Sequence, residues 1–258
     1  MRRGEDVADV YADWLMERGH PRGRLIAVQR ALRERPEDAA LREEEVWLLG
    51  ELWEPLVGID IEWRDGFVER ARVTNGYDLD RVLRDPSARM VRELVVEDTT
   101  AVAFVMRAWP PPPLRRLVLG SDETDWPVSV SDVGARYPDL EELELRGRAV
   151  EVGELYVPKL RVLRVDAMSL SARTIQSIVG ATWPALRALR VHQTPGCTAF
   201  VRALTRSPLA RVIDELALGR LVDGDAEMLV LHRAAFVQLV RSRFSGDTSD
   251  GLREAFPT

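Results

Sequence analysis

Apolar residues in the first fifty positions recur at helical spacing. The apolar face of the first segment consists of Val10, Tyr11, Trp14 and Leu15. Gly19 and Pro21 separate this segment from a second one of the same kind, and a third begins near Pro36 and ends before Pro55. The spacing therefore predicts three helices, of which the first two form an antiparallel hairpin, and we expect Trp14 to pack inward.

The hydrophobic period then changes from that of a helix to that of a strand. Apolar and polar residues alternate over 59–64, and Asp65-Gly66 follows, a pair that adopts the positive φ angles of a tight hairpin turn. The segment 67–73 continues in the same alternating manner and is interpreted as a degenerate first copy of the repeat that follows.

One pattern of the form LxxLxL then occurs six times. The copies are VRELVV from Val91, LRRLVL from Leu114, LEELEL from Leu140, LRVLRV from Leu160, LRALRV from Leu186 and IDELAL from Ile213. Their starts are 23, 26, 20, 26 and 27 residues apart, within the period of about 20–29 residues that leucine-rich repeats have. Each copy predicts a short strand with its leucines turned inward, and stacked copies form one parallel sheet. The sequence therefore predicts an α/β fold: a short leucine-rich-repeat solenoid with a parallel sheet on one face and helices on the other, after an N-terminal helical module.

These patterns predict five consecutive parts. They are a helical module over 1–56, a hairpin leading into the repeats over 57–75, the leucine-rich repeats over 76–222, a C-terminal capping helix over 223–244 and a mobile tail over 245–258.

The opening stretch VYADWLMERGHPRGRLIAVQRAL also carries a family resemblance. It closely resembles the bacterial repeat-companion domain, whose members typically have a "YADWLEE.GDPRGE.I.LQ" signature upstream of leucine-rich repeats. The matching residues are Tyr11, Ala12, Asp13, Trp14, Leu15, Glu17, Gly19, Pro21, Arg22, Gly23, Ile26 and Gln29. The stretch EWRDGFV, at 62–68, is similar to the segment through which such proteins pass into their repeats. The resemblance implies this architecture and no defined catalytic activity.

Composition narrows the classes of function. The chain has 258 residues, 46% of them hydrophobic, and a net charge of −6, which disfavours a protein that follows the nucleic-acid backbone. A single cysteine gives no disulfide framework, and no signal peptide or membrane span is evident, so we expect a cytoplasmic protein without membrane or nucleic-acid partners. Phosphate-binding glycine loops and HExxH spacing are absent from the sequence, so no cofactor and no metal are expected.

The polar positions of the repeat strands should form rows across the open face of the sheet. One predicted row is Val95, Val118, Glu144, Arg164, Arg190 and Ala217. Charged side chains concentrate in the central strands, and the candidate partner-binding residues are Glu142, Glu144, Arg146, Arg164, Asp166, Arg190 and His192. The function expected is that of a non-enzymatic scaffold or adaptor, which binds a protein through the sheet face or its edge loops.

Two other functions remain open at this point. An acidic surface would suit a cognate inhibitor or immunity-type protein that neutralises a basic effector. Cys197 with His192 five residues before it would suit a thiol hydrolase, although no orienting third group is recognisable.

In the opening hairpin, we expect Asp13 to pair with Arg22 or to cap the second helix rather than to catalyse.

Overall fold

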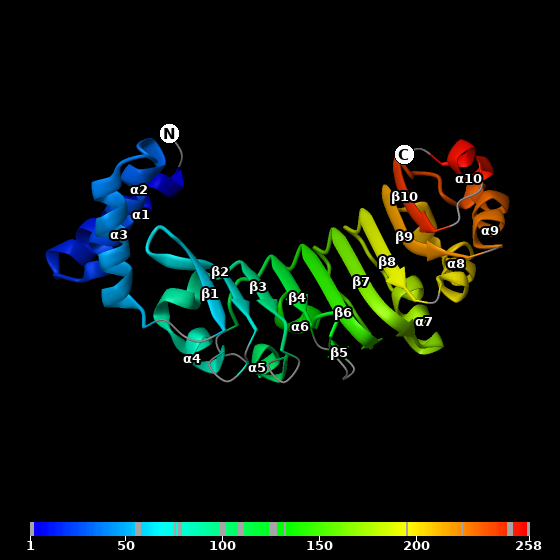
Figure 1. Cartoon of the computed structure of the whole chain (residues 1–258), viewed down its shortest axis with the longest axis horizontal. Helices are drawn as coiled ribbons and strands as arrows, with labels where there is room; N and C mark the ends of the chain where they lie inside the picture. The colour runs from blue at the N-terminus through cyan, green and yellow to red at the C-terminus, as the bar shows by residue number, and fades with distance from the viewer. Residues whose placement is uncertain are drawn as a thin grey trace.

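The computed structural model places one curved sheet between two sets of helices (Figure 1). It describes residues 3–54, 58–74, 76, 79–98, 102–107, 111–123, 128–131, 133–194, 196–222, 224–246 and 250–256. The strands are β1 Ile59–Arg64, β2 Phe67–Val73, β3 Glu93–Val96, β4 Arg116–Leu119, β5 Val128–Ser129, β6 Glu142–Glu151, β7 Val162–Leu170, β8 Ala188–Gln193, β9 Glu215–Leu221 and β10 Arg241–Gly246. The α-helices are α1 Arg3–Glu17, α2 Pro21–Glu34, α3 Ala39–Leu52, α4 Leu79–Arg84, α5 Val102–Arg107, α6 Val133–Arg136, α7 Ala172–Gly180, α8 Thr198–Leu204, α9 Asp225–Leu231 and α10 Asp250–Ala255.

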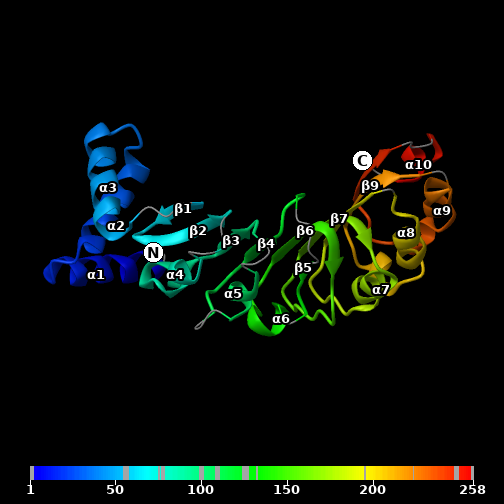
Figure 2. The ribbon, with the colours of Figure 1, turned by 60° about the horizontal axis from the view of Figure 1, so that its bottom comes forward.

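The strands follow one another across the sheet in the order β1-β2-β3-β4-β6-β7-β8-β9-β10, with β5 paired to β6. β1 and β2 are antiparallel, and the other pairings are parallel. Helices α4, α5, α7 and α8 lie along one side of the sheet, and the described chain places no helix over the middle of the other side, which we call the open face (Figure 1). Figure 2 shows α1–α3 gathered at one end of the sheet, and α9 and α10 at the other. The chain is thus an α/β protein with an open, mostly parallel sheet.

The six copies of the LxxLxL pattern each form a strand, as predicted, and the copies stand in register. One leucine from each strand lies beside the next along the sheet: Leu94, Leu117, Leu143, Leu163, Leu189 and Leu216. All six are at most 1% exposed, and burial of each such side chain is worth about 2 kcal/mol. The leucine period therefore builds the core, and it leaves the alternate positions on the open face.

The N-terminal hairpin is confirmed, but its packing differs from the prediction. Trp14 is 45% exposed rather than packed inward, and it stacks on the ring of Tyr11. The reason lies in Gly23 of α2, where a Cβ atom would stand 2.7 Å from the Ala12 carbonyl oxygen. Because α1 and α2 approach so closely, the buried contact falls on small Ala12 and on Leu15, and the larger aromatic rings remain at the rim.

The predicted role of Asp13 is wrong. His20 caps α2, because its Nδ1 accepts a hydrogen bond from the Arg22 backbone N–H at 3.2 Å. The Arg22 side chain, 9% exposed, donates instead to the hydroxyl of Ser87. Asp13 itself is exposed.

The turn predicted at Asp65-Gly66 is confirmed, with φ angles of 49° and 74°. The backbone N–H of Gly66 donates to Gln29 Oε1 of α2 at 2.9 Å. The hairpin tip is therefore fastened to the helical module.

The prediction for the C-terminal region is corrected. Instead of one capping helix over 223–244, the structure has α9, a short 3₁₀ turn and then β10, which pairs in parallel with β9. The predicted mobile tail over 245–258 includes the end of β10 and α10, and Leu252 and Phe256 beside it are buried. Phe256 packs edge-on against Phe236 and Phe244 with ring centroids 5.6 and 5.8 Å apart, so these rings close the end of the core.

The boundaries predicted at 56/57, 75/76 and 222/223 involve positions 56, 57, 75 and 223, which lie outside the described residues.

Candidate protein-binding face

The seven candidate residues lie together on three adjacent strands of the open face. β6 carries Glu142, Glu144 and Arg146, β7 carries Arg164 and Asp166, and β8 carries Arg190 and His192. The predicted row is confirmed by the strand register, which runs through Val95, Val118, Glu144, Arg164, Arg190 and Ala217. The register also extends the row to Arg72 on β2 and Arg243 on β10.

Glu144 is the centre of an ion-pair cluster. Its side chain is only 8% exposed, and one carboxylate oxygen accepts from Arg146 at 2.6 and 2.7 Å. Arg164 lies 3.4 Å from the same oxygen, and Arg116 reaches the other oxygen at 3.5 Å. Three cations around one buried carboxylate satisfy its charge and fix the geometry of the strands.

Asp166 joins two neighbouring strands by its two carboxylate oxygens. Arg164 donates to Oδ2 at 2.7 and 3.0 Å, and His192 Nδ1 lies 3.4 Å from Oδ1. Burial lowers the pKa of Arg164, but the hydrogen bonds that Arg164 donates to Asp166 and the negative charges of Asp166 and Glu144 outweigh it, so this pKa lies above its ordinary value. The guanidinium therefore remains charged under all ordinary conditions.

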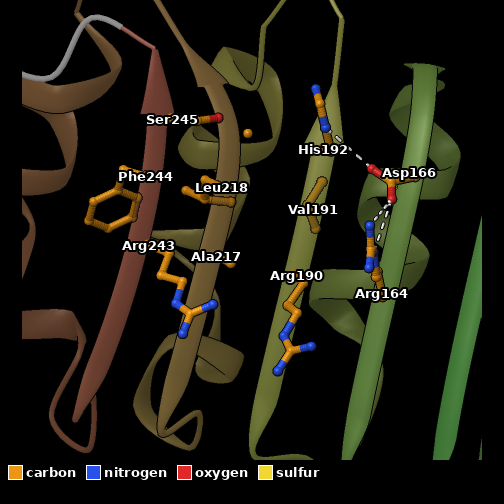
Figure 3. Close-up of a pocket in the computed structure, with 11 residues that line it drawn as sticks. Arg164, Asp166, Arg190, Val191, His192, Ala217, Leu218, Arg243, Phe244 and Ser245 are labelled. Carbon is orange, nitrogen blue, oxygen red and sulfur yellow. Dashed lines mark hydrogen bonds and ion pairs between the residues drawn. The ribbon is translucent and has the colours of Figure 1, made fainter. Parts of the chain in front are cut away.

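A hollow of about 240 Å³ opens on this face across β7 to β10. It is floored by small residues, Ala217 and Gly219, and Figure 3 shows the side chains of Arg190 and Arg243 on either side of Ala217. Arg164 lines its other wall. A hollow of this kind can receive a side chain of a partner, and its arginines favour an anionic one.

Arg243 is not among the residues predicted from the sequence, because the hydrophobic spacing there predicts a helix. The signal that would have found it is the alternation in Arg241-Ser242-Arg243-Phe244, in which the two arginines are exposed and Ser242 is buried. Four alternating residues are a short run, and the helical spacing of the preceding apolar residues outweighed it.

Cys197 does not have the surroundings of a nucleophile. The thiol is buried, and its Sγ lies 3.0 Å from the Gly219 carbonyl oxygen, to which it donates. Burial, together with the negative charge of Asp225, raises the pKa of Cys197 to about 11. A neutral, buried thiol argues against the thiol hydrolase, and the Nδ1 of His192 is directed to Asp166 instead.

The described residues contain no group of three or more histidine, cysteine, aspartate or glutamate side chains placed to hold a metal ion. None of the described helices has the length and apolar character needed to cross a membrane.

Comparisons with known proteins add little to this picture. No protein-family model matches the chain, and no curated protein matches it in sequence. A crystal structure of a protein from Bacteroides fragilis superposes with a TM-score of 0.48 and 14% sequence identity, covering 76% of this chain and 74% of the other. That likeness is too loose to bear on fold or function. The class of the protein is therefore defined by its own fold, as an α/β protein with an open, mostly parallel sheet that has one charged face, over the middle of which the described chain places no helix.

Proposed function

We propose that this chain is a non-enzymatic scaffold or adaptor of the leucine-rich-repeat type, and that it binds a protein partner through the open face or its edge loops. The observation that supports the proposal most directly is the register of the repeat strands. Six copies of one pattern place their leucines in a single buried row, so the polar positions project at fixed spacing from a rigid surface. Surfaces of this kind are used to bind extended partners.

The chemistry of the face also supports binding rather than catalysis. Most of its titratable side chains are engaged in ion pairs with one another, as Arg164 is with Asp166 and Glu144. The thiol that would serve as a nucleophile is buried and neutral at physiological pH. The three arginines of the hollow would repel a basic effector, so we do not favour the inhibitor or immunity-type function for this face.

The proposal is tested by capturing a partner from native lysate with matched variants. We expect Arg164→Ala/Arg190→Ala to lose a partner that the unchanged protein retains. The control is Arg173→Ala/Arg202→Ala, which removes the same charge from exposed positions on α7 and α8. Circular dichroism checks that both variants fold. Equal retention by the two variants would remove the open face from the binding function.

A further inference from the structure

The arginines of the open face are paired with carboxylates across most of the sheet. Arg72 on β2 reaches Glu97 at 2.6 Å, and Arg116 on β4 reaches Glu93 at 2.6 Å. Further pairs of this kind include Arg70 with Glu62 and Glu93, Arg146 with Glu144, Arg164 with Asp166, and Arg190 with Glu215. An arginine in the middle of the face therefore has a carboxylate supplied by its own or a neighbouring strand.

The two arginines of β10, Arg241 and Arg243, break this rule. Both are exposed, and neither side chain makes a hydrogen bond or ion pair with the described part of the chain. Of the two, Arg243 lines the hollow. On the neighbouring strand, the residue beside Arg243 is Ala217, which has no charge. Arg164, by contrast, has the carboxylate of Glu144 beside it on the next strand. The face therefore ends on β10 in a cation for which the described residues supply no anion.

Arg190, on the other side of Ala217, is only partly satisfied. Its Nε and Nη2 groups lie 2.9 Å from the same oxygen, Glu215 Oε1. Its Nη1 group has no partner among the described residues. A carboxylate placed above Ala217 would therefore meet unused donors from both arginines, and such charge-assisted bonds are the strong ones.

The shape of the hollow is set by the two small residues of β9. A side chain at Gly219 would strike the His192 ring, because its Cβ atom would lie 2.7 Å from Cγ. With glycine and alanine at these positions, the space between the strands stays open, to a volume of about 240 Å³. That space is large enough for one carboxylate side chain.

The net charge is negative in the first part of the chain and positive in the part that contains the hollow. Residues 1–150 hold 31 acidic and 22 basic side chains, a net charge of −9, whereas residues 151–258 hold 11 acidic and 14 basic ones, a net charge of +3. An acidic partner is therefore attracted to the β7–β10 end of the face and repelled from the helical module.

We propose that the hollow between β8 and β10 binds a glutamate or aspartate side chain of an acidic segment in the partner protein, with Arg243 as the main anchor and Arg190 as the second. This inference rests on the proposed function, since it names the chemistry of the partner. The carboxylate lies above Ala217 and gives Arg243 the kind of carboxylate partner that arginines elsewhere on the face have.

The probe for the test is hexaglutamate blocked at both ends, titrated at low ionic strength. The readout is the set of arginine Nε–Hε signals in a nitrogen-15 correlation spectrum of the full chain. We expect saturable shifts of the Arg190 and Arg243 signals, with a dissociation constant on the order of 1 mM for so short a peptide. Arg243→Ala should weaken binding about tenfold, because it removes a bidentate pair, and Arg173→Ala on α7 should leave it unchanged.

Two controls fix the source of the anion. Hexaglutamine should give no saturable shift, and inorganic phosphate should bind more weakly than hexaglutamate. Tighter binding of phosphate would overturn the carboxylate assignment, and so would equal effects of Arg243→Ala and Arg173→Ala.

The outcome is separable from that of the proposed function. If partner capture depends on Arg164 and Arg190 but the Arg243 signal does not respond to hexaglutamate, this inference is wrong and the scaffold function stands. If hexaglutamate binds through Arg243 but capture ignores the face, the hollow is an acid-binding site and the proposed function is wrong.

Discussion

Replacement of Glu144 by glutamine tests the electrostatic organisation of the face. Glu144→Gln keeps the shape of the side chain and removes its charge, which leaves Arg116, Arg146 and Arg164 clustered without the central anion. We expect the folded state to be destabilised at neutral pH.

The size of the effect follows from the burial of the cluster. Removal of one partner from a fully buried ion pair costs about 3–5 kcal/mol. The arginine side chains here are 32–42% exposed, so solvent screens part of the repulsion. Glutamine also keeps an oxygen that accepts from Arg146. Together these factors reduce the expected loss to about 2 kcal/mol in the free energy of unfolding.

The assay is urea unfolding followed by tryptophan fluorescence and by circular dichroism. A change in the midpoint at an unchanged m-value reports a loss of stability alone. The matched control is Glu154→Gln, at an exposed position where the described chain supplies no charged partner. A Glu144→Gln protein within about 0.5 kcal/mol of the control would refute the cluster as a source of stability.

Four further predictions concern two glycines and two buried side chains. Gly66→Ala should lower the free energy of unfolding by more than about 2 kcal/mol, because φ at this position is +74° and the new Cβ would lie 2.7 Å from Ile26 Cγ1. Gly50 lies in α3 with open space around it, so Gly50→Ala should instead raise the free energy of unfolding by about 0.5–1 kcal/mol in the same assay. Burial raises the pKa of Tyr137 from 10.0 to about 12, so between pH 10 and 12 this tyrosine ionises readily only in the unfolded chain. The stability that its protonated form contributes is therefore complete below pH 10 and should fall between pH 10 and 12. Phenolate absorbance should show Tyr137 ionising last, and simultaneous ionisation of all tyrosines would contradict its burial. Cys197 should react with a thiol reagent only as fast as the protein unfolds, and rapid labelling of the native chain would contradict the buried thiol.

The sequence predicted the parts of the fold that depend on local period. Alternating leucines gave the strands and their register, and Asp65-Gly66 gave the hairpin turn, because both signals act within a few residues. The orientation of Trp14 was not predictable in this way. It depends on how closely α1 approaches Gly23 on α2, which is a property of two helices and not of one pattern.

At the C-terminal end of the sheet, too, the local sequence pattern did not predict the structure. Helical spacing over the apolar residues of 223–244 outweighed four alternating residues, yet the chain there forms β10. What decides between the two is the packing of Phe244 with Phe256, a contact with a residue that the pattern assigned to a mobile tail. Tertiary packing therefore overrides local period where the periodic run is short.

Internal pairing also bears on which of the candidate residues a partner can use. Glu144, Arg146, Arg164 and Asp166 are already bonded to one another, so a partner that engaged them would first have to break those ion pairs. The described residues give Arg243 no such bond that a partner would have to break. The sequence pattern identified the most charged part of the face, but the energetically available part lies beside it, where the described residues no longer supply each arginine with a carboxylate. For this reason affinity for a partner should depend more on Arg243 than on any of the residues at the centre of the cluster.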